Sequence, residues 1–183
     1  MEPLKNIYSD QFFKLMIKVV TAVEPSFKGK DFLASIHSTE WQQLELKQRI
    51  RHISTNLGKF LPGDYQSQVG TICAIINHLQ KLPVKQNSFP WLFLPDFVEV
   101  YGLNDLKTSL NSMEVITSYI SCEFAVRPFL LSDPGTVMKK MLKWSKHPDE
   151  NVRRFSSEGC RPRLPWGKAI PAFKQDPSPI LPL

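Results

Sequence analysis

The sequence predicts an all-α protein built as a solenoid of stacked helices. Apolar residues recur at helical spacing along almost the whole chain, and no segment shows a sustained period-2 alternation. Proline and glycine separate these segments, as at Pro62-Gly63 and His147-Pro148. A chain of 183 residues, 42% apolar and 22% charged, is long enough to bury a core of its own. These features favour one folded domain of helices.

Capping residues and helix breakers predict the helices of the first half. Ser9 can cap a helix whose buried side carries Phe12, Phe13, Met16, Val19 and Val20. Thr39 and Gln42 match a capping box, ahead of a helix that Pro62-Gly63 ends. Asp64 can begin the next helix, which stops near Pro83, and residues 90–101 are expected to be helical.

The second half is predicted to hold one long helix and a pair of short ones. The long helix runs from about residue 104 to 127 and ends at Arg127-Pro128. Asp133-Pro134 begins a short helix, and Asp149 begins another after a turn at His147-Pro148. The side chains expected to face the core of this pair are Val137, Met138, Met141, Leu142, Val152, Phe155 and Ser156.

This pair of short helices, with a DxxVR pattern opening the second, is typical of a HEAT-like repeat. Repeats of that kind stack into an α-α superhelix with a concave surface. We therefore predict a HEAT-like solenoid over residues 1–183. Residues 1–130 would hold the N-terminal helices, and residues 131–183 would form a basic repeat segment.

Several classes of protein and site are disfavoured by the sequence. No run of 18 apolar residues could span a membrane, and the N-terminus lacks the pattern of a secretory signal. The three cysteines are widely spaced, which favours reduced thiols and a cytoplasmic location. The four histidines are scattered, so neither a metal nor another cofactor is predicted. We expect a monomer.

The net charge of +6 comes from one fifth of the chain. Residues 1–138 hold 13 Lys/Arg and 13 Asp/Glu, whereas residues 139–174 hold ten Lys/Arg against three Asp/Glu. A local excess of +7 is typical of a surface that binds a polyanion such as DNA. The alternative is a solvated basic face with no partner.

The segment HPDENVRRFSSEGCRPRLPWGK, residues 147–168, places five cationic side chains beside Trp166. Pro162 and Pro165 restrict the backbone after the helix, so the guanidinium groups and the indole have little conformational freedom. Guanidinium groups suit phosphate oxygens, and a rigid indole can lie against a sugar or base. Alternatively, Trp166 covers the core and the arginines pair with Glu150 and Glu158.

The run HPDENVRRFSSEGCRPRLPWGKA resembles the AlkC-type DNA alkylation repair glycosylases, as do YISCEFAVRPFL and YGLNDLKTSLNSMEVIT upstream. The resemblance covers at least residues 101–183. It implies a monofunctional glycosylase with a HEAT-like fold that excises alkylated bases such as 3-methyladenine from double-stranded DNA. It also implies that DNA bends around the concave surface without full flipping of the base.

The resemblance further implies roles for particular residues. Glu123 in SCEFAVRP would be the catalytic carboxylate, and Trp166, with Arg154, would contact the substrate. The remaining cations of the segment would bind DNA: Arg153, Arg161, Arg163 and Lys168. The alternative for Glu123 is a surface ion pair with Arg127, four residues further along the expected helix.

Chains of this family continue through further repeats that supply a second carboxylate and part of the DNA groove. Asp176-Pro177 looks like the start of such a repeat, so we expect the sequence to be C-terminally incomplete. Two other functions stay open: a DNA-binding module without catalysis, and a scaffold that binds other proteins.

Overall fold

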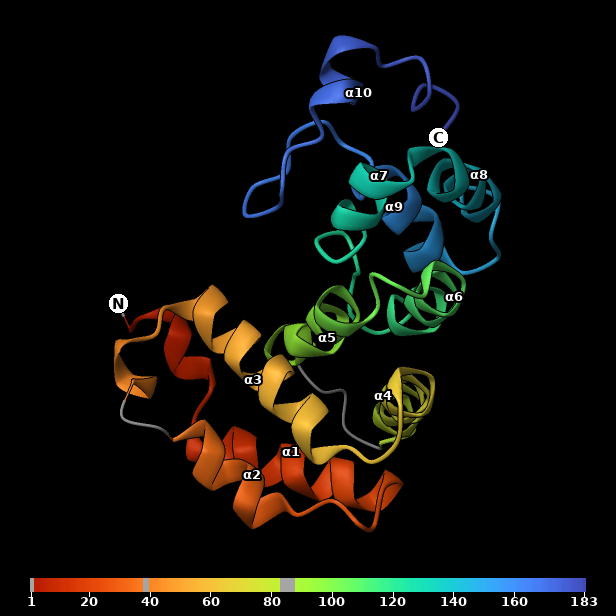
Figure 1. The fold of residues 1–183 in the computed structure, drawn as a ribbon. Helices are drawn as coiled ribbons and strands as arrows, with labels where there is room; N and C mark the ends of the chain where they lie inside the picture. Colours follow the sequence, from red (N-terminus) through yellow and green to blue (C-terminus); the bar gives the residue numbers. More distant parts are fainter. Residues whose placement is uncertain (1, 38–39, 83–87) are drawn as a thin grey trace.

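Helices make up the regular structure of the chain in the computed structural model, which describes residues 2–37, 40–82 and 88–183 (Figure 1). Those residues contain no strand, which confirms the all-α prediction. The α-helices are α1 (Asp10–Val23), α2 (Gly29–Ile36), α3 (Leu46–Phe60), α4 (Tyr65–Gln80), α5 (Phe93–Tyr101), α6 (Leu106–Ile116), α7 (Arg127–Ser132), α8 (Pro134–Trp144), α9 (Glu150–Glu158) and α10 (Pro171–Gln175).

The helices stack in two layers, as a solenoid requires. Figure 1 shows α4, α6 and α8 along one side, and α3, α5 and α9 along the other. Helix α3 packs against α5, α4 against α6, and α8 against both α7 and α9. The buried apolar side chains form one core that extends from Tyr8 to Phe173. The predicted superhelix is therefore confirmed, and the division of the domain at residue 130 stays a prediction.

Two of the predicted helix starts are confirmed by their caps. The Ser9 hydroxyl accepts a hydrogen bond from the Phe12 amide at 3.3 Å. The Asp64 carboxylate accepts one from the Ser67 amide at 3.0 Å. Gly63 has a φ of +82° in the turn before α4, a conformation that glycine adopts without a steric penalty.

The start of α3 differs from the prediction. Of the two residues predicted to cap it, Thr39 lies outside the described residues, and Gln42 belongs to a short 3₁₀ turn, Trp41–Gln43. Pro83, the predicted stop of the following helix, also lies outside the described residues. Helix α3 itself begins at Leu46, where Glu45 and Gln48 form the capping box. The capping box therefore exists, but it lies six residues further along the chain than the predicted pair of Thr39 and Gln42. The short helices α2 and α10 were not predicted at all.

The predicted long helix over residues 104–127 is wrong. Helix α6 ends at Ile116, residues 117–126 form turns, and α7 begins at Arg127. Side-chain hydroxyls compete with the helical hydrogen bonds here, since Ser118 donates to the Val115 carbonyl at 2.7 Å. Pro128 lies in the first turn of α7, where a proline needs no amide hydrogen.

The predicted pair of short helices corresponds to α8 and α9. Asp149 caps α9, and Val152, Phe155 and Ser156 are buried as expected. Leu142 is 37% exposed, contrary to the prediction, and Trp144 is buried in its place. Trp144 lies three residues after Met141 and seven after Val137, which is the spacing of one helix face.

Candidate nucleic-acid interface

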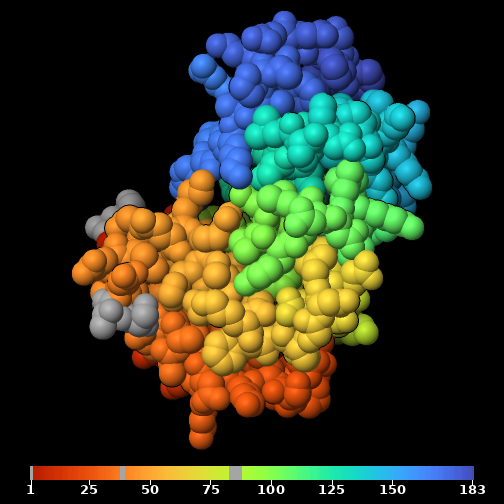
Figure 2. All heavy atoms as spheres, viewed as in Figure 1, coloured from red at the N-terminus to blue at the C-terminus, as the bar shows by residue number. Residues whose placement is uncertain are grey.

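A cleft of about 820 Å³ lies between the N-terminal helices and the loop that follows α9. One wall comes from α3 and α5, and the other from residues 124–125 and 166–168. In Figure 2 the blue loop extends to the orange surface of the earlier helices. The charged and aromatic groups in its lining are Lys47, Arg51, Lys59, Asp96, Glu99, Phe124, Trp166 and Lys168.

Trp166 is 52% exposed and lines this cleft. The alternative that it covers the core is therefore wrong. Its φ of +68° is a left-handed conformation that costs a residue other than glycine about 1–3 kcal/mol. The carbonyl of Trp166 accepts a hydrogen bond from Lys47 Nζ at 2.6 Å, so a side chain of α3 holds the strained residue.

Arg127 lies beneath the same loop with none of its surface exposed. Its guanidinium donates to the carbonyl of Gly159 at 3.0 Å, to that of Arg161 at 2.8 Å, and also to that of Lys168. Burial lowers the pKa of this guanidinium. An arginine nevertheless stays protonated in proteins, so a buried positive charge organises the backbone on both sides of Trp166.

Glu123 lies in the turns before α7 and not on a helix, which corrects the predicted position. Its amide donates to the Ser121 hydroxyl at 3.3 Å, and that hydroxyl donates to the carboxylate at 3.4 Å. Arg127 directs its donors to the loop carbonyls, so the alternative of a surface pair between Arg127 and Glu123 is wrong. Glu123 is half-buried and does not line the cleft, whereas its chain neighbours Phe124 and Ala125 do.

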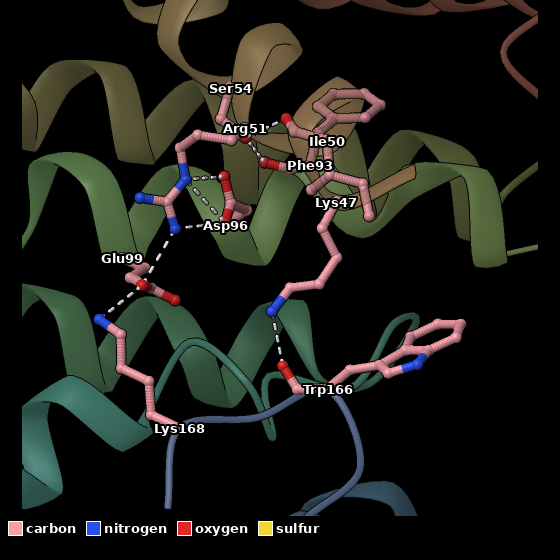
Figure 3. A network of polar contacts seen from close by, with 9 residues as sticks. All are labelled: Lys47, Ile50, Arg51, Ser54, Phe93, Asp96, Glu99, Trp166 and Lys168. Carbon is pink, nitrogen blue, oxygen red and sulfur yellow. Dashed lines mark hydrogen bonds and ion pairs between the residues drawn. The ribbon is translucent and has the colours of Figure 1, made fainter. Parts of the chain in front are cut away.

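Four charged side chains form a network across the cleft (Figure 3). Arg51 of α3 binds both Asp96 oxygens, with Nε at 2.9 Å from one and Nη2 at 2.8 Å from the other. Glu99 pairs with Arg51 and with Lys168, each at 3.0 Å. Burial raises the pKa of the Asp96 carboxyl, against the opposite effect of its hydrogen bonds from Arg51.

Sequence reasoning missed most of the residues in this network. Lys47, Arg51, Asp96 and Glu99 belong to a region whose total charge is zero, so composition did not single them out. Their spacing places each pair on one helix face, because Arg51 comes four positions after Lys47 and Glu99 three positions after Asp96. That spacing could have indicated two charged faces, but not their meeting with Lys168.

The four predicted arginines lie outside the cleft lining. Arg153 donates to the carbonyls of His147 and Pro148 at 2.8 and 2.7 Å, which fixes the turn before α9. Arg161 pairs with Glu158 at 2.9 Å, one of the pairs considered in the alternative interpretation. Arg154 and Arg163 are exposed.

The lysines of α8 lie on a different surface. Lys107, Lys139, Lys140 and Lys143 surround a hollow of about 480 Å³ between α6 and α8. Lys140 is neutralised by Glu114 at 2.8 Å. This hollow shares no lining residue with the cleft, so the lysines of α8 and Lys168 lie on separate surfaces.

Two further properties concern the part of the chain that the structure describes. There, no group of three or more His, Cys, Asp or Glu side chains could hold a metal ion. Within the same residues, each helix is too short or too polar to cross a membrane.

Comparison with known proteins identifies relatives along the whole chain. No model of a known protein family matches it. YhaZ, an uncharacterised protein of Bacillus subtilis (strain 168), is 40% identical over 183 residues. The solved structure of the Pseudomonas fluorescens alkylpurine DNA glycosylase AlkC, bound to DNA containing an abasic-site analogue, is 33% identical and matches with a TM-score of 0.90. The chain is homologous to AlkC.

This relationship confirms the resemblance that the SEGCRPRLPW segment indicated. The match with AlkC covers 100% of this chain and 49% of the AlkC chain. YhaZ is likewise matched over 49% of its length. The chain thus spans about half the length of the two relatives, and AlkC shares its helical-repeat fold.

Proposed function

We propose that the chain carries the base-excising site of a DNA glycosylase that removes alkylated purines, such as 3-methyladenine, from double-stranded DNA. The observation that carries this proposal is Trp166, an exposed ring on a strained and firmly held backbone, at a cleft that Phe124, the chain neighbour of Glu123, also lines. Strain of that kind persists where the surrounding structure fixes it, and it often marks a functional site.

Release of an alkylated purine requires little from the protein beyond electrostatic stabilisation. Alkylation at N3 or N7 makes the purine cationic, so its bond to the sugar is already weak. As that bond breaks, positive charge develops at C1′ of the sugar, and water then adds there and releases a proton. In our proposal the Glu123 carboxylate stabilises the developing charge, and the Trp166 ring bounds the sugar on one side.

DNA binding would draw on the cations between residues 153 and 168. Arg154 and Arg163 are exposed and form no ion pair with another described residue, which leaves their guanidinium groups free to bind phosphate oxygens. Lys168 shares its charge with Glu99, and Arg161 with Glu158, so both would contribute less. Arg153 would act through the turn that it fixes. We expect a monomer that acts on DNA in the cytoplasm, without a metal or other cofactor.

One experiment separates the proposed glycosylase from a DNA-binding module without catalysis. The 183-residue chain is mixed with methylated duplex DNA, and released purines are measured by mass spectrometry. The same assay uses a chimera in which this chain replaces the matching 183 residues of YhaZ. We expect methylated purine to be released by the chimera, and slowly or not at all by the chain alone.

The outcomes of this experiment are distinct. DNA binding without release of methylated purine, by both proteins, would support the binding module instead. Binding of acidic peptides with no preference for DNA would support a protein-interaction scaffold.

A further inference from the structure

Two lysine contacts join the walls of the cleft at the loop that carries Trp166 (Figure 3). Lys47 of α3 donates to the Trp166 carbonyl at 2.6 Å. Two residues further along the chain, Lys168 pairs with Glu99 of α5 at 3.0 Å. The loop is therefore held from the opposite wall at two points, by helices distant from it in sequence.

The acceptor for Lys168 is itself fixed in place. The Glu99 side chain is only 12% exposed and pairs with Arg51 Nη2 at 3.0 Å. Arg51 is oriented in turn by its bidentate hydrogen bonds to Asp96. A carboxylate with so few alternative positions constrains Lys168 more than a free surface acid would.

The loop needs such contacts because Arg127 fixes its two ends and not its tip. The guanidinium binds the carbonyls of Gly159, Arg161 and Lys168, and Trp166 lies between these anchors. Trp166 has the strained φ of +68°, and half of its side chain is exposed. Among the described contacts, the Lys47 bond is the one that fixes its carbonyl from the other wall.

We propose that Lys47 and Glu99 are positioning residues, which hold the Trp166 loop across the cleft so that the ring meets the sugar in a fixed place. This inference rests on the proposed function. Neither residue acts on the substrate itself. Their effect is on the rate of base release from bound DNA, because an ordered ring lowers the cost of reaching the reactive geometry.

The first test measures the loop directly and needs no activity. The Gly167 amide donates to the Leu164 carbonyl at 3.0 Å, and the Ile170 amide to that of Pro162 at 2.9 Å. Hydrogen exchange of these amides reports local opening of the loop. In Lys47→Met we expect their exchange to be about tenfold faster, the effect of losing one charge-assisted hydrogen bond.

Lys59→Met is the matched control for this test. Lys59 lies on the same helix, lines the same cleft, and contacts Asn56 rather than the loop. Its replacement removes the same charge and should leave exchange in the loop unchanged. Lys47→Arg retains a donor and should restore slow exchange. Equal exchange in Lys47→Met and the wild type, or an equal increase in Lys59→Met, would overturn the proposal.

The second test uses the chimera with YhaZ and single-turnover release of 3-methyladenine. We expect Lys47→Met and Glu99→Gln to lower the maximal rate by about tenfold, with a DNA Kd no weaker than that of Lys59→Met. Circular dichroism confirms that each variant is folded. If the loop amides exchange faster in the variants while the maximal rate is unchanged, neither residue contributes to the reaction.

The two proposals fail in different ways. If the wild-type chimera releases no methylated purine, the proposed function is wrong, and with it the role of Lys47 and Glu99 in that reaction. If the wild type is active and the variants match it in rate, the proposed function stands and the positioning role alone is wrong.

Discussion

Two regions of the basic segment have the same sign of charge and quite different surroundings. In α8, Lys139, Lys140 and Lys143 lie along a regular helix beside α6. From Gly159 to Lys168, the chain forms a loop that crosses to α3 and α5. The first region buries its tryptophan, Trp144, whereas the second exposes Trp166.

This difference shows that an excess of positive charge can locate a segment that binds a polyanion, but cannot locate the proposed site within that segment. A helix distributes its lysines over a solvated face, and Glu114 already neutralises one of them. The proline-containing loop instead presents a ring at a cleft, on a backbone that a buried arginine holds. The site we propose depends on that loop and not on the total of +7.

The largest expected effect separates the two tryptophans. Trp144 is 1% exposed and donates from Nε1 to Glu114 at 2.6 Å. Trp144→Ala should lower the free energy of unfolding by about 3–5 kcal/mol, because it leaves a cavity in the core. Trp166→Ala should change it by less than about 1 kcal/mol, since an exposed side chain buries little surface. Urea denaturation measures the free energy of unfolding of both variants, and equal losses in the two would contradict the comparison.

A second comparison concerns two arginines beside the same loop. Arg127→Met leaves several buried carbonyls without a donor, so we expect a loss of about 3 kcal/mol in the free energy of unfolding. Arg161→Met removes an exposed pair with Glu158 and should cost less than about 1 kcal/mol. Thermal or urea denaturation measures both. A small loss in Arg127→Met would mean that the buried guanidinium does not hold the loop.

The salt dependence of DNA affinity should distinguish Arg154 on α9 from the lysines around the hollow beside α6. If about four phosphates are neutralised, the slope of log affinity against log salt should be roughly −3.6. Arg154→Ala should reduce the size of that slope by about one. Lys143→Ala, which removes one charge from the hollow beside α6, should leave the slope unchanged. Fluorescence anisotropy with duplex DNA measures the slope. Equal changes in the two variants would mean that DNA contacts both α9 and the hollow beside α6.

The smallest expected effect is that of a chelator. A cationic leaving group needs no metal-activated water, and the residues described offer no cluster of metal ligands. EDTA should leave the helical circular dichroism and the DNA affinity unchanged. Loss of either signal, with recovery on adding a divalent metal, would contradict this prediction.

Much of the fold was predictable because its signals are local. Ser9, Asp64 and Asp149 each cap a helix where the sequence predicts one. The spacing of apolar residues also predicted most of the buried faces. Prediction failed where tertiary contacts or side-chain hydroxyls decide the backbone, as in residues 117–126, whose apolar spacing resembles that of a helix.

The candidate site was predictable only in part, for a related reason. Trp166 and Glu123 were singled out because they lie in segments that resemble a known family. Lys47 and Glu99 were missed, because contacts between residues distant in the chain leave no local pattern in the sequence. Lys47, for example, lies 119 residues before its partner Trp166. The alternative pairing of Arg127 with Glu123 was wrong, since the helix that would have placed the two side by side does not form.

The most direct test of this account is the rate of 3-methyladenine release by Glu123→Gln, a change that keeps the shape of the side chain and removes its charge. In the chimera with YhaZ we expect the single-turnover rate to fall about 100-fold, the effect of losing one electrostatic stabiliser. Glu158→Gln, which alters a carboxylate that pairs with Arg161 outside the cleft, should keep the wild-type rate. A wild-type rate in Glu123→Gln would contradict the proposed site.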